Sequence, residues 1–208
     1  MLTDRDEAIL ETLTHRVRML SAEQVARTWF GNSADPVRLA RSRLRQLQEA
    51  GYLDRLDALA RPELELEEPL FRWEPGEAEP DFAALSRRCS GRWSQPVERT
   101  SLYVASSRAG VLYGGSGGRS PRLSEVSHDL SLAGLYLRHF RPNGHRVEWT
   151  SEASLIRMGY GDQSRVPDAL VTENGSSRAI ELGGTYSSAK LEDFHAFCTE
   201  EALAYELW

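Results

Sequence analysis

Residues 39–56 read LARSRLRQLQEAGYLDRL, and this stretch decides the fold expected for the first third of the chain. Asp35 and Pro36 precede it as an N-cap and a proline at the first helical position, so a helix is predicted from Pro36 until Gly51 ends it. One side of this helix carries Val37, Ala40, Leu44 and Leu47, and an adjacent side carries Arg38, Arg41 and Arg45. The helix therefore has one face that packs and another that presents guanidinium groups.

Two shorter helices are predicted before it. Thr3 and Asp6 have the spacing of a capping motif at the start of a helix within residues 2–14. Ser21 is the expected N-cap of the next helix, which breaks at Gly31. These signals predict three helices in the first fifty residues.

The residues that follow predict a β-hairpin. Residues 51–56 turn into a strand, and a second strand is expected at 69–73, beyond a variable tip. Three helices followed by a hairpin is the order of a winged helix-turn-helix domain, whose third helix enters the major groove of DNA. Arginine on that helix contacts phosphates or guanine, so Arg38, Arg41 and Arg45 are candidate DNA-binding residues and double-stranded DNA is the expected partner.

The charge distribution allows a second use of this region. The net charge is −6, and residues 61–81 alone contain eight acids against two arginines. Acids on a wing would repel phosphates, so this loop either points away from DNA or contacts a protein partner. Dimerisation through the winged helix is also compatible with the sequence.

Length and composition favour two domains. The chain has 208 residues, and 74–81, EPGEAEPD, has the composition of an exposed connection. We expect a winged helix at 1–75, a linker and connecting segment at 76–100, and a second domain at 101–208. The cysteines Cys89 and Cys198 have no metal-ligand spacing, and no apolar run is long enough for a membrane span, so a cytoplasmic protein without a membrane partner is expected.

The last hundred residues predict a mixed sheet. A long helix is expected at 123–140, followed by strands at 146–149, 169–172 and 178–182. Asn174-Gly175 between the last two strands is a hairpin signal. A helix at 187–200 and a strand at 204–208 complete an α/β domain with a helix on each face of the sheet.

This element order resembles the core of PD-(D/E)xK nucleases, which are restriction-endonuclease-like. Asp168, after Pro167 at the start of one strand, and Glu181 in the next strand carry the resemblance. It implies that both carboxylates bind Mg²⁺, with a basic residue near the attacked phosphate. The usual lysine position is Gly183 here, and some members of the fold place that lysine on the following helix, where Lys190, the single lysine of the chain, lies. Glu125 is a candidate accessory ligand.

Larger parts of the sequence resemble the replication-relaxation family of plasmid and mobile-element proteins. The residues that carry this resemblance are HDLSLAGLYLRHF at 128–140, VPDALVTE at 166–173, AIELGG at 179–184 and the final YELW. The resemblance implies DNA binding in plasmid maintenance and a nuclease-like domain that is degenerate in some members.

Our leading hypothesis is a DNA-binding protein of plasmid or mobile-element type with a nuclease-like second domain, which uses Mg²⁺ if its site is active and no cofactor if its site is degenerate. One alternative is an active Mg²⁺-dependent DNA endonuclease that uses Asp168, Glu181 and Lys190. Another is a non-enzymatic adaptor or transcriptional regulator that binds a partner protein. Convergence of the three proposed catalytic residues in space would favour the endonuclease over the adaptor.

Overall fold

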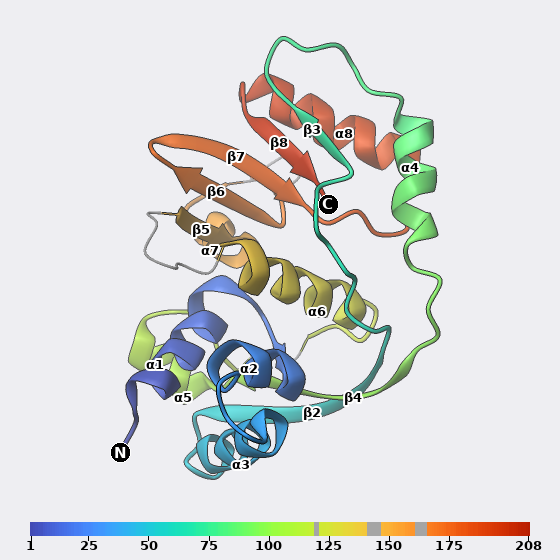
Figure 1. Ribbon diagram of the computed structural model, residues 1–208. Helices are drawn as coiled ribbons and strands as arrows, with labels where there is room; N and C mark the ends of the chain where they lie inside the picture. The colour runs from blue at the N-terminus through green and yellow to red at the C-terminus, as the bar shows by residue number, and fades with distance from the viewer. Residues whose placement is uncertain (119–120, 141–146, 161–165) are drawn as a thin grey trace. The chain divides into compact units, whose positions relative to one another are not determined.

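The computed structural model describes residues 1–118, 121–140, 147–160 and 166–208 (Figure 1). Contacts divide the chain into two compact units, each built from two separated pieces. The first unit comprises Met1–Glu63 and Val97–His139, and the second comprises Leu64–Pro96 and Phe140–Trp208. This division differs from the expected segments 1–75, 76–100 and 101–208, because the middle of the chain contributes to both units.

The first unit begins with helices that start where the sequence predicts. They are α1 (Asp4–Glu11), a π-helical turn (Thr12–Arg16), α2 (Ala22–Trp29) and α3 (Pro36–Glu49). Complete capping boxes, Thr3 with Asp6 and Ser21 with Gln24, start α1 and α2. The Asp35 side chain caps α3, and a residue at φ +76°, Gly51, follows its end. The three predicted helix starts are confirmed.

A three-stranded antiparallel sheet completes the N-terminal part of this unit. Its strands are β1 (Leu20–Ser21), β2 (Leu53–Ala60) and β4 (Glu98–Ala105), in the order β1-β4-β2. The central strand β4 therefore pairs with both of the others. One face of the sheet packs on a core of Met19, Ala58, Ala60, Leu102, Val104, Val126 and Leu130.

The prediction that β2 forms a hairpin with the next strand along the chain was wrong. The segment near 69–73 forms β3 (Phe71–Trp73), but β3 pairs with β8 in the second unit. The partner of β2 is β4, and Ala60 lies opposite Glu98. Residues 61–97 are thus inserted between two paired strands. Trp73 explains why β3 pairs with β8. Its ring is buried and stacks on the ring of Tyr205 of β8, with the two ring centroids 5.6 Å apart.

Two further helices belong to the first unit. They are α5 (Ser107–Tyr113) and α6 (Val126–Leu135), and α6 continues as a π-helical turn (Tyr136–Phe140). The helix expected at 123–140 therefore exists but begins later. The structure assigns α6 to the core of the first unit, where Val126 and Leu130 are buried, although the sequence placed it on the C-terminal sheet.

The second unit contains the predicted mixed sheet. Its strands are β3, β5 (Val147–Ser151), β6 (Ala169–Glu173), β7 (Ser176–Glu181) and β8 (Ala204–Leu207), in the order β3-β8-β7-β6-β5. β7 and β8 are parallel, because α8 (Ser188–Glu200) crosses between them. Asn174 and Gly175 have φ of +52° and +82°, which confirms the predicted hairpin turn. Arg146, at the start of the strand expected at 146–149, lies outside the described residues.

Helices α4 (Phe82–Gly91), α7 (Glu152–Arg157) and α8 pack in this unit. Phe194, Phe197 and Cys198 of α8 bury Ala179 of β7 and Tyr205 of β8. The α4 side chains Leu85 and Cys89 pack with Leu191 of α8 and Leu207 of β8, and α4 lies beside α8 in Figure 1. Within the residues described, no helix combines the length and apolar character that crossing a membrane requires.

Candidate functional site

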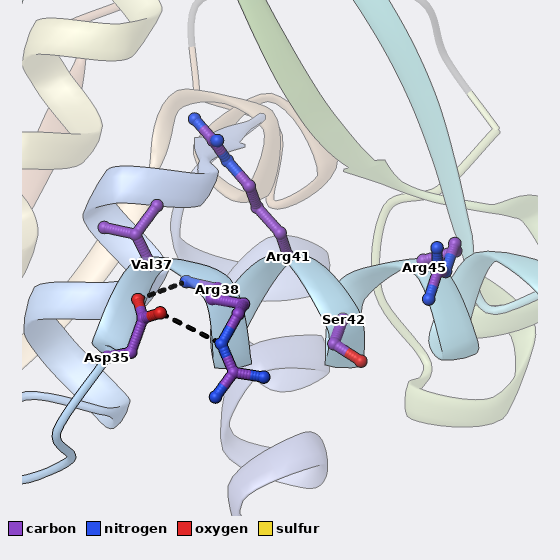
Figure 2. A pocket seen from close by; sticks show the side chains of 6 residues that line it. All are labelled: Asp35, Val37, Arg38, Arg41, Ser42 and Arg45. Atoms are coloured by element: carbon purple, nitrogen blue, oxygen red, sulfur yellow. Dashed lines mark hydrogen bonds and ion pairs between the residues drawn. The ribbon is translucent and has the colours of Figure 1, made fainter.

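The exposed face of α3 forms an open surface pocket. Its lining residues all lie on α3 or at its N-cap: Asp35, Val37, Arg38, Arg41, Ser42 and Arg45. Figure 2 shows the three arginine side chains spread along this face, with Arg38 bent back to Asp35. The side chains of Arg38, Arg41 and Arg45 are 73%, 63% and 69% exposed. The predicted arginine face therefore exists and is accessible.

Each of these arginines has an acidic neighbour. The N–O distances are 2.9 Å from Arg38 to Asp35, 2.7 Å from Arg41 to Glu23 of α2, and 3.9 Å from Arg45 to Glu49. Exposed ion pairs of this kind contribute about 0–1 kcal/mol each. A phosphate can replace the carboxylates at small cost, so the pairs do not prevent contact with DNA.

The fourth arginine of this helix has a structural role. Arg43 donates to both carboxylate oxygens of Asp6, from Nε at 2.7 Å and from Nη2 at 2.5 Å. The Asp6 side chain is fully buried. Arg43 thus ties α3 to α1, and it is not part of the exposed face.

The first acid of the acidic stretch is also structural. Glu63 accepts hydrogen bonds from Arg27 Nη2 at 2.6 and 2.7 Å and from Gln24 Nε2 at 3.0 Å. Its side chain is only 15% exposed and lies against Gly134 of α6, where a Cβ would clash with it. The remaining acids of the stretch, from Glu65 onward, belong to the second unit.

Asp168 and Glu181 lie side by side in the second unit. Ala169 of β6 pairs with Ile180 of β7, which places the preceding Asp168 next to Glu181. The Asp168 backbone N–H donates to Glu181 Oε2 at 3.3 Å, and the Leu182 backbone N–H donates to Asp168 Oδ2 at 2.8 Å. Glu181 is 2% exposed. The two proposed metal ligands are adjacent at the end of the β6–β7 hairpin away from its turn.

A tyrosine connects this carboxylate pair to Lys190. The Tyr186 hydroxyl donates to Glu181 Oε1 at 2.8 Å, and Lys190 Nζ lies 3.3 Å from the centroid of the Tyr186 ring. A cation over an aromatic face is an attractive contact. All three residues of the proposed catalytic set therefore belong to one cluster, in which Tyr186 is the link that sequence reasoning missed.

The structure explains why residue 183 is a glycine. A Cβ at Gly183 would clash with Cys89 Sγ of α4. The Gly183 carbonyl accepts hydrogen bonds from Trp93 Nε1 at 2.8 Å and Arg92 Nη2 at 3.3 Å. The end of α4 thus fills the space that a side chain at position 183 would need.

The carboxylate pair has the oxygen chemistry that Mg²⁺ prefers. Magnesium is commonly held by one or two carboxylates together with waters and substrate phosphates, so Asp168 and Glu181 fit that requirement. Among the described residues, no group of three or more His, Cys, Asp or Glu side chains is arranged to hold a metal ion. Glu125, the expected accessory ligand, belongs to the first unit, where Arg18 and Arg122 pair with it at 3.2 and 3.0 Å.

Sequence reasoning also missed the C-terminal end of α4. Residues 87–93, RRCSGRW, combine three arginines with a tryptophan, and Arg92 and Trp93 contact the Gly183 carbonyl. Basic residues interleaved with an aromatic one are a composition found at nucleic-acid surfaces. The signal was present, but the segment was interpreted as a connection between domains.

Comparisons with known proteins found no matching family model, curated protein or solved structure.

Proposed function

We propose that the first unit is a winged helix-turn-helix domain that binds double-stranded DNA through α3. The observation that carries the proposal is the sheet order β1-β4-β2 joined to α1, α2 and α3. In that topology the third helix is the one that enters the major groove. The exposed face of α3 here carries Arg38, Arg41 and Arg45.

The charge of the two units supports this assignment. The first unit has 15 arginines and 13 acids, a net charge of +2, whereas the second has 10 basic and 18 acidic residues, a net charge of −8. The acidic character of the whole chain therefore resides in the second unit. Positive charge near α3 favours association with phosphates, and release of counterions makes such binding sensitive to salt.

The β2–β4 pair is the proposed wing. Its outward face carries Arg55 and Arg99, and Asp57 accepts hydrogen bonds from both at 3.2 and 3.1 Å. Residues 64–96, between the two strands, fold with the second unit, so this wing is not a simple hairpin. The resemblance of the sequence to replication-relaxation proteins points to plasmid DNA as the setting for this activity.

Duplex binding is tested by replacing the arginine face in the full chain. We expect the triple variant Arg38→Gln, Arg41→Gln and Arg45→Gln to weaken binding to a labelled duplex by about 100-fold, with a shallower salt dependence. Fluorescence anisotropy at several salt concentrations measures both effects. Arg122→Gln is the control, because Arg122 is an exposed arginine of the same unit but not of α3. Equal affinity of the triple variant and the wild type would refute the proposal.

The carboxylate cluster supports a second candidate function, a Mg²⁺-dependent DNA endonuclease. In this reading Asp168 and Glu181 would hold the metal, which would neutralise charge at the phosphate and make an attacking water more acidic. Lys190, held by the Tyr186 ring, stabilises the developing charge. Tyr186 orients Glu181 through its hydrogen bond.

Metal titration and cleavage assays separate an active site from a degenerate one. Calorimetry with Mg²⁺ or Mn²⁺ should show binding that Asp168→Asn weakens, because the substitution removes an anionic ligand. Lys190→Ala should abolish cleavage of plasmid, linear or single-stranded DNA and preserve metal binding. Metal binding without cleavage by the wild type would indicate a degenerate site, and no metal binding would remove this candidate.

A further inference from the structure

The arginines at the end of α4 differ from those of α3 in having no acidic partner. Arg87 and Arg88 are exposed, and Arg92 follows the last residue of the helix as its C-cap. Throughout the described part of the chain, no carboxylate forms an ion pair with Arg87, Arg88 or Arg92. This is unusual in a unit whose net charge is −8, where acidic side chains are plentiful.

Arg92 is the member of this group that is held in place. Its Nη2 donates to the Gly183 carbonyl at 3.3 Å, and its Nε is buried with no hydrogen-bond partner among the described residues. Burial lowers its pKa, and the neighbouring charge of Arg88 lowers it further. A partly buried guanidinium next to a second one is costly unless an anion compensates both charges.

The surroundings of Arg92 match a phosphate group. Guanidinium N–H groups form a planar fork that binds phosphate oxygens in pairs. Trp93, which is partly exposed, is fixed beside Arg92 because its Nε1 donates to the same carbonyl at 2.8 Å. An aromatic ring next to a phosphate-binding arginine is the combination by which proteins hold single nucleic-acid strands.

We propose that Arg88 and Arg92 form a binding site for a phosphate group of a nucleic-acid backbone, with Trp93 beside it. The site lies next to Gly183, two residues after Glu181, and so it would hold a strand near the Asp168–Glu181 pair. It is independent of duplex binding by α3, because it is built from residues of the second unit alone. A helix end alone would attract one arginine through its dipole, but it does not require the buried and unpaired Nε of Arg92.

The indole N–H of Trp93 provides a local readout in the full chain. The protein has five tryptophans, so a ¹H–¹⁵N spectrum contains at most five indole signals, and Trp93→Phe identifies the signal of interest. The titration uses a chain that also carries Arg38→Gln, Arg41→Gln and Arg45→Gln, so that α3 does not contribute. A 12-nucleotide single-stranded DNA and, separately, inorganic phosphate are added at constant ionic strength.

We expect the Trp93 signal to shift in a saturable way with the oligonucleotide. Arg88→Gln should weaken this binding about tenfold, the effect of losing one charge-assisted hydrogen bond. Arg92→Lys should also weaken it, since lysine keeps the charge but loses the fork. Arg72→Gln, which removes an arginine that Glu206 already pairs with at 3.3 Å, is the control and should have no effect.

Three outcomes would overturn the proposal. They are an unchanged Trp93 signal, a shift that persists in both the Arg88→Gln and Arg92→Lys variants, and an equal shift of the Trp93 signal when chloride replaces the oligonucleotide. Saturation by inorganic phosphate but not by DNA would assign the site to a free phosphate and reject the nucleic-acid backbone as its ligand. None of these results depends on whether α3 binds a duplex, because duplex binding is measured separately by anisotropy.

Discussion

Asp6 and Arg43 form a two-point ion pair in which the Asp6 side chain is fully buried and the Arg43 side chain is 28% exposed. The pair joins the first turn of α1 to the middle of α3. Burial alone would raise the pKa of Asp6, but hydrogen bonds from Arg43 and Thr3 outweigh it and lower the pKa to about 2. The orientation of the proposed DNA-binding helix thus depends on a carboxylate that must stay ionised.

This relationship predicts acid sensitivity of the first unit. Because the folded-state pKa of Asp6 lies below its unfolded value of 3.8, its stabilisation is present above pH 4 and is lost as the pH falls toward 2. The shift corresponds to about 2 kcal/mol of unfolding free energy. Urea unfolding at several pH values should show this loss in the wild type. Asp6→Asn should be less stable at pH 6 and should have a flatter pH profile, and an identical profile would contradict the prediction.

The insertion between β2 and β4 changes which fragment can fold. Residues 1–75 contain the three helices, β1 and β2 but lack β4, the strand that pairs with both β1 and β2. We therefore expect the fragment 1–75 to show no cooperative thermal transition. A fragment that joins residues 1–61 to 97–139 through a short glycine-containing turn should melt cooperatively, because Ala60 already lies opposite Glu98. Circular dichroism of both fragments checks this, and cooperative melting of 1–75 alone would contradict it.

Local signals made part of this fold predictable. The capping residues Thr3, Ser21 and Asp35 and the turn at Asn174-Gly175 act within a few residues, and each element they predict is present. The partner of β2 was not predictable in this way, because strand pairing over the insertion depends on which buried faces meet. Phe71 and Trp73 read as a wing strand by proximity, but they pack with the aromatic residues of β8 and α8.

The candidate site likewise contains residues whose proximity follows from local sequence signals and residues whose roles depend on tertiary packing. Asp168 and Glu181 were singled out by the resemblance to a nuclease core, and their proximity was predictable because both belong to one hairpin, whose register follows from its turn. Tyr186 and Arg92 were not found, because their roles depend on α8 and α4 lying together over the end of β7. The glycine at position 183 was visible in the sequence, but the reason a side chain does not fit there, the contact with Cys89 of α4, was not.

Glu23 should limit the affinity of α3 for DNA. It holds Arg41 Nη2 at 2.7 Å, and a phosphate must displace it before Arg41 can contact the backbone. We expect Glu23→Gln to tighten duplex binding about two- to fivefold, in line with the small energies of exposed pairs. The gain in affinity should disappear in an Arg41→Ala background, since Glu23 affects DNA binding only by pairing with Arg41. Anisotropy on the four proteins measures the coupling, and a gain that persists without Arg41 would show a general charge effect instead.

His195 should make the second unit less stable in mild acid. Its ring packs edge-on against Trp73 at 4.8 Å, and Nδ1 lies 3.2 Å from the Tyr205 hydroxyl. Burial lowers its pKa, an effect that the charge of Glu79 partly offsets. Because the unfolded state binds the proton more tightly, the stability falls as the pH drops below the unfolded value of 6.5. Denaturation between pH 7.5 and 5 should show this fall, and His195→Phe should reduce the slope. An unchanged slope in that variant would assign the acid sensitivity to other groups.

A side chain at position 183 should destabilise the second unit. The space beside Gly183 is filled by Cys89 Sγ of α4, which is buried in a cluster with Leu85, Leu191 and Leu207. We expect Gly183→Ala to cost about 1–3 kcal/mol of unfolding free energy, the usual range for overpacking a core.

The cause can be isolated with a double variant, because Cys89→Gly removes the atom that clashes. If that contact is responsible, Gly183→Ala should cost much less in the Cys89→Gly background than in the wild type. Urea unfolding of the four proteins gives the coupling energy. A cost that is the same in both backgrounds would mean that the backbone around Trp208, and not α4, excludes a side chain there. The explanation given above for Gly183, exclusion of a side chain by Cys89 of α4, would then have to be abandoned.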